Sequence, residues 1–456
     1  MKREKRAQNK QVEDSCGGRK EMNLRASSAL QQKAHALIPG GCHTYAKGDD
    51  QYPEIAPAFI VRGQGCHVWD VDGNEFIEYG MGIRAVTLGH AYPPVVEAAH
   101  RQMLLGNNFT RPAAIEVECA EEILGMIDGA EMVKFAKNGS DVTTAAVKLA
   151  RAYTARDLVA VCAEHPFFSV DDWFIGATPM AAGIPLTMRN MTLKFHYNDL
   201  ASVETLFSEH PGEIACIILE AETTEPPVTN FLHELQQLCK KNGTLLILDE
   251  MITGFRWHNG GAQAYYDIVP DLSAFGKALG NGFSISALLG KKAIMELGGL
   301  YHDKERVFLL STTHGAEAHS LAAATETMRI YQQQPVVEHL YRQGNRLAKG
   351  VNSAIVENRL QDYFHLAGKP CNLIYVTRDQ DKNRSQPFRT LFLQEIIKRG
   401  IIAPSLVVSF SHTDEDIDRT IEAIGASLNV YRKALAEGLE KYLVGRSVKP
   451  VFRPFN

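Results

Sequence analysis

The sequence predicts an α/β fold in which a mostly parallel sheet lies between helices. Between about 94 and 325, short apolar runs with the length of strands alternate with helical stretches, and this alternation is typical of a parallel sheet. One unit is especially clear, because CIILE at 216–220 and TLLILD at 244–249 flank a helix expected at 230–243. Such a βαβ unit has a right-handed crossover, so its two strands should run parallel.

The chain before and inside this region shows further elements. The stretch 24–38 has amphipathic spacing and ends at a Pro-Gly-Gly turn, which predicts a short helix. At 58–79, apolar and polar residues alternate between glycine-containing turns, which predicts antiparallel strands. Within the α/β region, the spacing predicts a helix over 140–154 and a strand over 157–162.

After about residue 335 the pattern becomes mainly helical. NLIYVT at 372–377 is the one strand that we expect there. A long helix is expected over 412–443, with Thr413 or Asp414 as its N-cap. The last five residues, FRPFN, are expected to form a loose tail.

Composition indicates a globular chain with more than one domain. Of 456 residues, 45% are hydrophobic and 22% are charged, which suits roughly two to four domains. The formal net charge is -5, which gives no general attraction to nucleic acid or anionic lipid. No apolar run approaches the roughly 18–20 residues that span a bilayer. We therefore expect neither a nucleic-acid partner nor a membrane partner.

Cysteine usage and the N-terminus bear on the compartment. The eight cysteines are scattered and form no C-x-x-C pair, so they predict neither a zinc cage nor a disulfide scaffold. The N-terminus is basic, but no apolar stretch follows the charges, so it is not a secretory signal peptide. We expect a disordered tail at the N-terminus and a reducing, cytoplasmic compartment.

Two carboxylates and an isolated lysine form the first chemical signal. Glu220 and Asp249 end their strands, so both acids should lie at the carboxyl edge of the sheet, where α/β folds bind ligands. Lys277 stands in FGKALGNG, away from any run of charge, where glycines let the backbone approach a ligand. A structural lysine in a turn is the alternative for Lys277 alone.

A helix N-terminus forms the second signal. Gly139 and Ser140 open the helix expected at 140–154, with Ser140 as its N-cap. The unpaired N–H groups and the dipole of such a terminus can hold a phosphate, and ordinary capping is the alternative. A phosphate site, a strand-end carboxylate and an isolated lysine together meet the needs of pyridoxal 5'-phosphate (PLP).

The motifs also resemble those of a known family. The matching stretches are IPGG (38–41), RGQGCHVWDVDGNEFIEY (62–79), LGHAYPPVVEAA (88–99), KNGSDVTTAAVKLARAYTARD (137–157), ILDEMITGFRW (247–257) and PDLSAFGKALGNGF (270–283). Over roughly residues 24–430 the chain resembles the class-III, fold-type-I PLP-dependent aminotransferases. Within that family it is most similar to the glutamate-1-semialdehyde 2,1-aminomutases.

The resemblance implies a large domain, with its mostly parallel sheet between helices, and a smaller α+β domain built from both chain ends. The domain limits that we expect are a disordered tail at 1–22, an N-terminal segment that packs with the small domain at 23–80, a large PLP-binding domain at 81–330, a C-terminal small domain at 331–445 and a tail at 446–456. Members of the family are usually homodimers with the active site at the interface, and we expect the same here.

Position by position, the resemblance assigns roles around the cofactor. Lys277 matches the lysine that forms the Schiff base, and Asp249 matches the partner of the pyridinium nitrogen, so both are expected to be catalytic. Met251 matches the residue that lies against one ring face, where the family usually has Val. Gly139 and Ser140 match the phosphate loop.

Three further assignments follow from the resemblance. Thr312 resembles the threonine that reaches the phosphate held by the neighbouring subunit. Glu220 resembles a glutamate near the hydroxyl side of the ring, although Ala221 stands where the family has Pro. Phe167 takes the position of a stacking Tyr and can still stack, with a core phenylalanine as the alternative. No clustered metal-ligand spacing occurs, so we expect no metal site.

Three departures argue against the aminomutase reaction itself. Lys47 lies in HTYAK, where the aminomutase has an arginine that helps to bind the substrate carboxylate. Arg84 lies in GIRAVT, where the family has a tryptophan, so it brings a new charge toward the substrate, unless it is a surface or structural arginine. The segment after Ser405 is shorter and lacks the glutamate of the aminomutase.

We therefore expect an aminotransferase with ping-pong kinetics, which moves an amino group from an amino-acid donor, expected to be glutamate, to a ketone or aldehyde. Intramolecular transfer of the aminomutase type is the alternative. A binding or regulatory protein with this fold is a second alternative, against which the intact Lys277, Asp249 and Gly139-Ser140 argue. A metal hydrolase is a third, and no H-E-x-x-H motif supports it.

Overall fold

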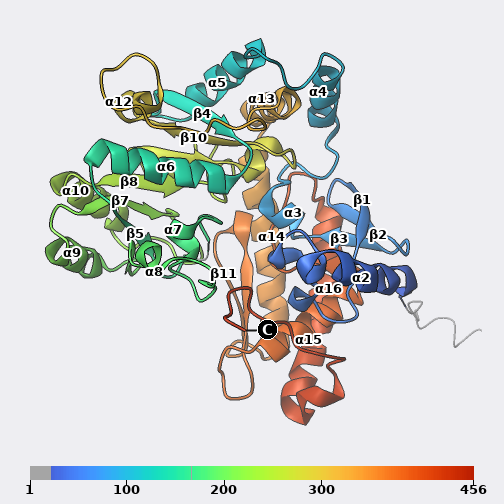
Figure 1. Cartoon of the computed structure of the whole chain (residues 1–456). Coiled ribbons are helices and arrows are strands. Elements are labelled where there is room, and N and C mark those ends of the chain that lie inside the picture. Colours follow the sequence, from blue (N-terminus) through green and yellow to red (C-terminus); the bar gives the residue numbers. More distant parts are fainter. Residues whose placement is uncertain (1–21, 166, 456) are drawn as a thin grey trace, which may run out of the picture.

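The computed structural model of the protein describes residues 22–165 and 167–455. Its central element is a sheet of seven strands in the order β4-β10-β9-β8-β7-β5-β6 (Figure 1). β10 is antiparallel to both of its neighbours, and the other adjacent pairs are parallel. The strands are β4 (Met132–Ala136), β5 (Leu158–Cys162), β6 (Thr192–Phe195), β7 (Ile214–Leu219), β8 (Leu245–Asp249), β9 (Leu272–Phe275) and β10 (Ser286–Gly290). The α/β fold and the parallel pairing of β7 with β8 are confirmed.

Helices cover both faces of this sheet, which explains why its central strands β7 and β8 are buried throughout. On β5, Val159 and Val161 pack with α6, whereas Ala160 and Cys162 pack with α9 and α10, because successive side chains of a strand point to opposite faces. The helices are α2 (Arg25–Leu37), α4 (Pro93–Met103), α5 (Ala114–Met126), α6 (Gly139–Thr154), α7 (Asp172–Ile175), α8 (Leu186–Arg189), α9 (Leu200–Glu209), α10 (Phe231–Lys241), α11 (Gly261–Tyr265), α12 (Lys292–Met295), α13 (Ala318–Gln333), α14 (Val336–Glu357), α15 (Gln386–Ile397) and α16 (Asp414–Glu437).

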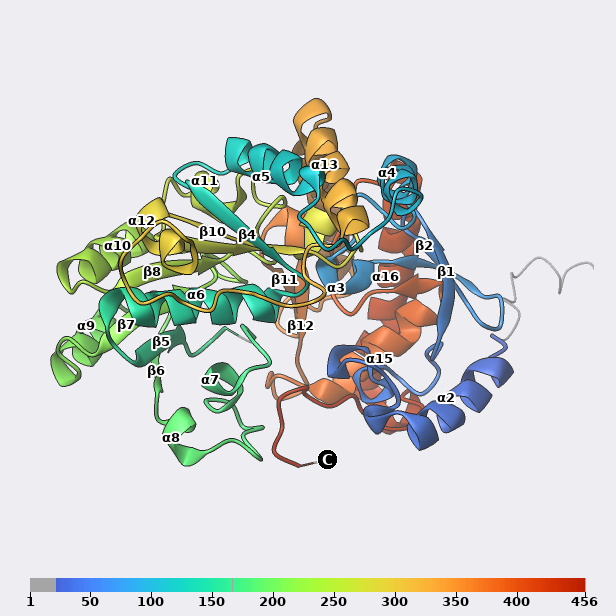
Figure 2. The ribbon, with the colours of Figure 1, turned by 45° about the horizontal axis from the view of Figure 1, so that its top comes forward.

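A second sheet joins the two ends of the chain. β1 (Ile60–Gln64), β2 (His67–Asp70) and β3 (Glu75–Glu78) are antiparallel, as predicted. The short strand β13 (Ile401–Ile402) adds to β3 in parallel, with Ile401 opposite Ile77. Figure 2 shows this sheet beside α15 and α16 and apart from the large sheet. A separate hairpin pairs β11 (Phe364–Ala367) with β12 (Ile374–Thr377).

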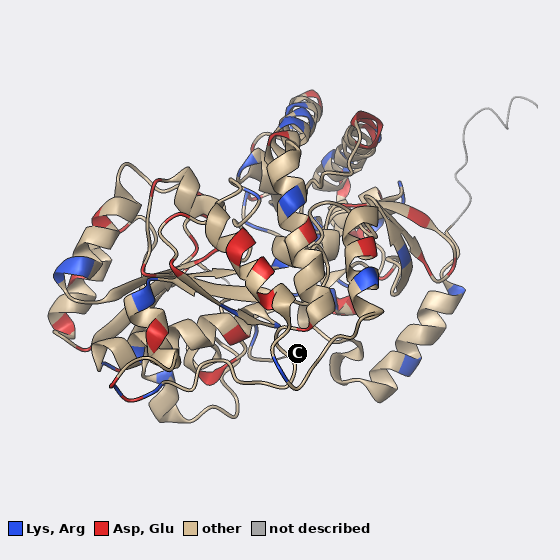
Figure 3. Cartoon of the chain, turned by 90° about the horizontal axis from the view of Figure 1, so that it is seen from above, with Lys and Arg blue, Asp and Glu red and all other residues tan. Residues whose placement is uncertain are grey.

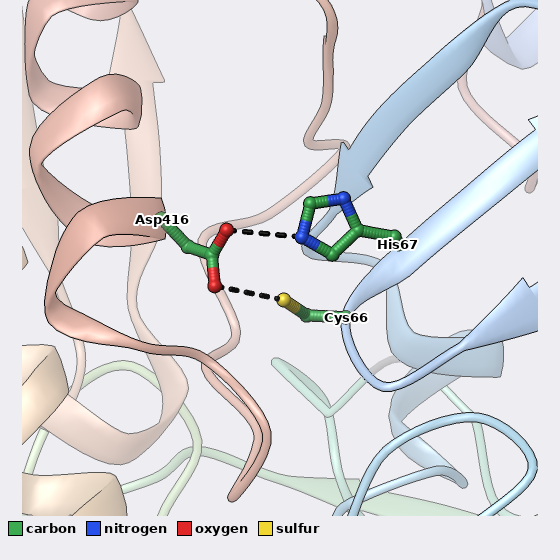
Figure 4. Close-up of side chains that lie close together, drawn as sticks. All are labelled: Cys66, His67 and Asp416. Atoms are coloured by element: carbon green, nitrogen blue, oxygen red, sulfur yellow. Dashed lines mark hydrogen bonds and ion pairs between the residues drawn. The ribbon is translucent and has the colours of Figure 1, made fainter.

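A buried cluster connects the small sheet to α16 (Figure 4). The carboxylate of Asp416 accepts hydrogen bonds from Nε2 of His67 at 3.0 Å and from Sγ of Cys66 at 3.4 Å. It also accepts the backbone N–H and the hydroxyl of Thr413, which caps the helix. Potential metal-ligating atoms of Cys66, His67 and Asp416 lie within 4.8 Å of one another. Since these hydrogen bonds engage all three side chains, the cluster acts as a junction between the two chain ends.

Three local predictions are corrected. The helix expected over 412–443 ends at Glu437, because Gly438 has a φ of 99°. Helix α6 begins one residue earlier than expected, with Asn138 as its N-cap in place of Ser140. The last five residues, expected as a loose tail, are partly held over 452–455, because Arg453 donates to Asp50 at 2.6 Å and Phe452 packs against the core.

The expected N-terminal tail at 1–22 lies, apart from Met22, outside the described residues. Within 22–165 and 167–455, no helix combines the length and the apolar composition that crossing a membrane requires.

Candidate active site

Parallel strand ends bring polar side chains to one edge of the large sheet. Asp249 is the last residue of β8, Glu220 follows β7 directly, and Lys277 comes two residues after β9. β7, β8 and β9 are adjacent and parallel, so their carboxyl ends lie side by side. The parallel pairing of β7 with β8 brings Glu220 and Asp249 to the same edge of the sheet, as the sequence predicted.

The three charged groups act on one another in a desolvated setting. Asp249 and Glu220 are 3% and 5% exposed. Burial raises the pKa of both carboxyls, the charge of Asp249 raises the pKa of Glu220 further, and the Lys277 ammonium lowers both pKa values. Desolvation in turn lowers the pKa of Lys277, while the two carboxylates raise it. Among the described residues Nζ of Lys277 makes no hydrogen bond or ion pair, so its amine is available to a ligand.

The side chain of Met251 lies between two parts of this site, the start of α6 and the residue before Lys277. A Cβ placed on Gly139 would lie 3.0 Å from Sδ of Met251, and one placed on Gly276 would lie 2.6 Å from the same atom. Because both glycines lack a side chain, the thioether fits between the start of α6 and the residue before Lys277. The two motifs that the sequence analysis singled out separately are therefore packed against each other.

The start of α6 leaves backbone donors toward this region. Asn138 is extended, and its backbone N–H donates to the Asp141 carboxylate at 2.9 Å. Oγ of Ser140 accepts the backbone N–H of Val170 at 3.1 Å, so its hydroxyl proton remains available. The N–H groups of the first helical turn have no partner within the helix, and with the helix dipole they favour an anion.

His165 is a site residue that the sequence analysis missed. It follows β5 and is 5% exposed, and its Nδ1 accepts the backbone N–H of Glu220 at 3.1 Å. Burial lowers the pKa of His165 to about 4, so the ring is neutral and carries its proton on Nε2. The signal available in the sequence was a histidine just beyond a buried strand, at the same sheet edge as Glu220.

The two adjacent acids at the end of β8, Asp249 and Glu250, have different roles. Glu250 is buried, and its carboxylate accepts the backbone N–H groups of Ala262 and Gln263, at 2.9 and 2.7 Å, and the hydroxyl of Thr253. Asp249 accepts one backbone N–H, from Met251, at 2.9 Å. Glu250 therefore holds the start of α11, whereas Asp249 is the acid that faces Lys277.

Arg84 lies on an unusual turn beside these groups. The four residues of α3 (Met81–Arg84) have φ angles of 42°, 59°, 58° and 67°, so this is a left-handed turn although three of its residues are not glycine. Nε of Arg84 donates to Oδ1 of Asn372 at 2.8 Å, and its carbonyl accepts from Arg256 at 3.0 Å. Burial, followed by the charge of Arg256, lowers the pKa of Arg84 to about 10.

The three remaining predicted residues are exposed in the structure. Lys47 is exposed and borders the same cavity as Arg84. Phe167 is 43% exposed and makes an edge-to-face contact with Phe174 at 5.8 Å, whereas its neighbour Phe168 is buried. Thr312 is exposed and borders a different cavity of about 760 Å³.

A sheet edge that carries a buried carboxylate pair, an unbonded lysine and a helix N-terminus defines an α/β enzyme built for a phosphorylated cofactor that reacts with amines. The profile of the family "Aminotransferase class-III" matches residues 47–427. The chain is 32% identical, over 433 residues, to a glutamate-1-semialdehyde 2,1-aminomutase of Alkaliphilus oremlandii (strain OhILAs), covering 90% of this chain and 100% of that protein.

Solved structures agree with this. The FumI protein of Sphingopyxis sp. MTA144, in its PLP internal aldimine form, is 28% identical and has a TM-score of 0.82, covering 90% of this chain and 97% of the other. A glutamate-1-semialdehyde aminomutase of Pseudomonas aeruginosa PAO1 has a TM-score of 0.77 at 18% identity, covering 89% and 94%, and shows the shared fold.

The chain belongs to the class-III aminotransferase family. The fold is the fold type I of PLP-dependent transferases, with a large α/β part and a smaller part built from both chain ends. The cofactor of this family is PLP, and the chain is an enzyme of this class.

Proposed function

We propose that this protein is a PLP-dependent aminotransferase that moves an amino group from glutamate to a ketone or aldehyde with ping-pong kinetics. The observation that carries the proposal is the buried amine of Lys277, which makes no hydrogen bond or ion pair in the described structure although the charges of Asp249 and Glu220 act on it. A lysine used for structure would be paired with one of these acids. The PLP-bound form of the 28% identical FumI protein supports the cofactor.

The residues present fit PLP. The backbone N–H groups of Gly139 and Ser140 would hold the phosphate, and the Asp249 carboxylate would face the ring nitrogen. Met251 and Phe167 would cover the two ring faces, and Glu220 would lie on the hydroxyl side. When bound, PLP supplies a carbonyl carbon that bonds to amines and a ring that withdraws electrons from the substrate's α-carbon.

Each side chain then has a definite task. Lys277 would hold the cofactor and then, as a free amine, would move a proton at Nζ from the substrate's α-carbon to the cofactor carbon that the lysine had held. Desolvation lowers the pKa of Lys277, which raises the fraction of neutral amine that can act as a base. Asp249 keeps a proton on the ring nitrogen by its negative charge.

Intramolecular transfer of the aminomutase type is the second candidate. The 32% identical relative is named a glutamate-1-semialdehyde 2,1-aminomutase, which favours it. Lys47 and Arg84 stand where the aminomutases have other side chains, which favours intermolecular transfer. Conversion of glutamate 1-semialdehyde to the tetrapyrrole precursor without a second substrate would establish the aminomutase reaction.

The visible absorbance of the purified protein with PLP tests the proposal. We expect a yellow band that bleaches when glutamate is added. The Lys277→Ala variant should lose transamination by about 10³-fold or more, because covalent attachment and proton transfer are lost together. Lys292→Ala, on the exposed face of α12, is the control and should match the wild type. A Lys277→Ala variant that transaminates at the wild-type rate would refute the assignment.

We further propose a homodimer in which Thr312 contacts the phosphate in the partner's site. The groove beside Thr312 is bordered by Val117 and Phe308, which are 62% and 69% exposed, and exposed apolar side chains of this kind mark interaction surfaces. Mixing Lys277→Ala with Thr312→Ala subunits tests this. If Thr312 acts across the interface, the mixed dimer contains one intact site and regains activity that neither variant has alone. If Thr312 acts within its own subunit, mixing restores nothing.

We also propose a cytoplasmic location. The seven cysteines in the described part of the chain are free thiols, and six of them are buried, as in proteins of reducing compartments. Fractionation of cells that express the full chain tests this.

A further inference from the structure

The large cavity beside α3 is bordered by four basic side chains, most of which have no carboxylate partner among the described residues. It has a volume of about 1060 Å³ and is bordered by Lys47, Arg84, Arg389 and Arg446. Arg446 is paired with Asp49, at 3.6 Å. Within 22–165 and 167–455, the other three cations form no ion pair with a carboxylate. Elsewhere in the chain, basic and acidic residues are interspersed (Figure 3).

The three acids that border this cavity already have partners, and Oε1 of Glu54 accepts the backbone N–H of Arg446 at 3.1 Å. Oε2 of Glu78 is 2.5 Å from Nε2 of His90. Oδ2 of Asp49 accepts from Gln31 at 2.9 Å in addition to its pairing with Arg446. The cations of the cavity therefore face open space rather than unused carboxylates of the chain.

Arg84 is held so that the end of its guanidinium is free. It is half-buried, and its Nε donates to Asn372. In the described structure its two terminal nitrogens donate to no protein atom. Arg84 borders the cavity and also acts electrostatically on Lys277 and on Glu220. The neighbouring Arg256 is fully buried and holds the carbonyl of Arg84.

Arg389 lies on α15 and also borders the cavity. One terminal nitrogen donates to the carbonyl of Pro404 at 2.6 Å, and the guanidinium lies over the ring of Tyr375, 4.9 Å from its centroid. It is half-buried as well. These contacts fix the direction of the side chain while leaving its charge without a counter-ion among the described residues.

The backbone under Arg84 adds an independent reason to expect function. Left-handed φ values are unfavourable for residues other than glycine, and three of the four residues of α3 are of this kind. Strain of this kind persists where the surrounding structure enforces it, and it clusters at ligand sites. Here the strained turn ends at Arg84, whose side chain borders the cavity.

We propose that Arg84 and Arg389 bind a negatively charged group, a carboxylate or a phosphate, on the part of the substrate that points away from the transferred amino group. A guanidinium presents a planar set of donors that matches both anions, and a half-buried cation without a counter-ion gains most from binding one. The inference rests on the proposed aminotransferase function, since it names the substrate class of that site.

Calorimetry on the PLP-loaded enzyme tests binding without any reaction. The probes are succinate, inorganic phosphate and the neutral 1,4-butanediol. We expect at least one anion to bind at least tenfold more tightly than the diol, and Arg84→Gln or Arg389→Gln to remove that difference. Tighter binding of succinate identifies a carboxylate, and tighter binding of phosphate identifies a phosphorylated substrate. Arg389→Lys should retain part of the affinity, which separates lost charge from misfolding.

Arg101→Gln is the matched control, because Arg101 lies on α4 with its side chain 68% exposed and does not border the cavity. This variant should bind the anions as the wild type does. The inference is overturned if neither anion binds more tightly than the diol, or if the Arg84→Gln and Arg389→Gln variants both bind like the wild type.

Acceptor preference gives the second readout. Succinic semialdehyde is compared with butanal, and glyceraldehyde 3-phosphate with glyceraldehyde. We expect at least one charged aldehyde to exceed its neutral counterpart in kcat/KM by 30-fold or more, and this ratio to fall at least tenfold in Arg84→Gln and Arg389→Gln. Equal kcat/KM values within both pairs would overturn the inference. If no amine bleaches the PLP band, the proposed function fails, and calorimetry still decides whether the cavity binds anions.

Discussion

At Lys277, burial and two carboxylates act on the same proton in opposite directions. Desolvation lowers the pKa of the amine, and the charges of Asp249 and Glu220 raise it. Because these acids are themselves buried, removing one negative charge alters the protonation of the other two groups. Substitutions here should therefore change the pH profile as well as the rate.

The neighbouring acids Asp249 and Glu250 give a matched pair of predictions. Asp249→Asn keeps the shape but removes the charge that faces Lys277, and we expect transamination to fall by about 10²-fold or more. Glu250→Gln places an amide N–H against one of the backbone donors that Glu250 accepts. It should therefore destabilise the protein by about 1–3 kcal/mol while the residual activity per folded molecule is kept. Kinetics and urea unfolding of both variants test this, and the reverse pattern would contradict the assignment.

His165 predicts a pH-dependent contribution to stability. Its folded-state pKa is lowered to about 4 by burial, whereas an exposed histidine has a pKa of about 6.5. Between these values the unfolded chain binds more protons, so stability rises with pH, and the contribution of His165 is lost as pH falls from about 6.5 toward 4.

The His165→Ala variant leaves the backbone N–H of Glu220 without its acceptor. We expect a loss of about 1–3 kcal/mol at pH 8 and a smaller loss at pH 5. Urea unfolding at the two pH values measures both, and equal losses would show that the neutral imidazole is not the contributing form.

At the scale of elements, the junction between β2 and α16 shows how one side chain can join distant parts of the chain. Both ring nitrogens of His67 face carboxylates, Nδ1 toward Glu75 at 2.9 Å and Nε2 toward Asp416 at 3.0 Å. Both contacts are hydrogen bonds only when the ring is protonated. The pKa of His67 is accordingly raised, first by its hydrogen bond to Asp416.

This junction should be most stable in mildly acidic solution. The raised pKa of His67 gives a contribution that is fully present below about pH 6.5 and is lost as pH rises through the folded-state value. Asp416, whose pKa is lowered by its bonds to His67 and Thr413 despite its burial, contributes above about pH 4 and less as pH falls.

We expect His67→Gln to destabilise the protein most near pH 5 and least above pH 8. Thermal unfolding across this range measures the difference. His210→Gln is the control, because His210 faces a single exposed acid, Glu213, at 3.6 Å. A loss for His67→Gln that does not vary with pH would contradict the charged junction.

The parts of the site that could be predicted from the sequence are those that a single strand or helix defines. Apolar runs locate the strands, and the residue that ends each run then lies at the sheet edge, as Glu220 and Asp249 do. Asn372 could not be found in this way, because it meets Arg84 across 288 positions of the chain. Arg389 was missed for the same reason, since nothing in the local pattern of α15 shows that it borders a cavity. The left-handed turn at Arg84 is equally invisible, because three of its four residues disfavour it.

At the scale of the whole molecule, the two chain ends together build one wall of the cavity beside α3. The segment around Asp49 and Tyr52 borders the cavity, and Arg446 donates to both of their carbonyls, at 2.7 and 3.5 Å. Val448 is 4% exposed, and its N–H donates to Thr390 of α15 at 2.9 Å. The C-terminal segment therefore connects the part of the cavity wall around Asp49 and Tyr52 to α15, the helix that carries Arg389.

Removal of residues 446–456 should therefore lower stability and impair substrate binding at the same time. The deletion removes the buried side chain of Val448 and several hydrogen bonds, among them that of Lys449 N–H to Asp50 at 2.9 Å, so we expect a loss of about 2–4 kcal/mol. KM should rise while kcat changes less, because the wall of the cavity loosens and Lys277 remains in place.

Arg446→Ala should reproduce part of the KM effect with a smaller loss of stability. A deletion that begins at 454 keeps Arg446, Val448 and the contact of Arg453 with Asp50 at 2.6 Å, and it should behave as the wild type. If the longer deletion leaves both Tm and KM unchanged, the C-terminal segment has no part in shaping the cavity.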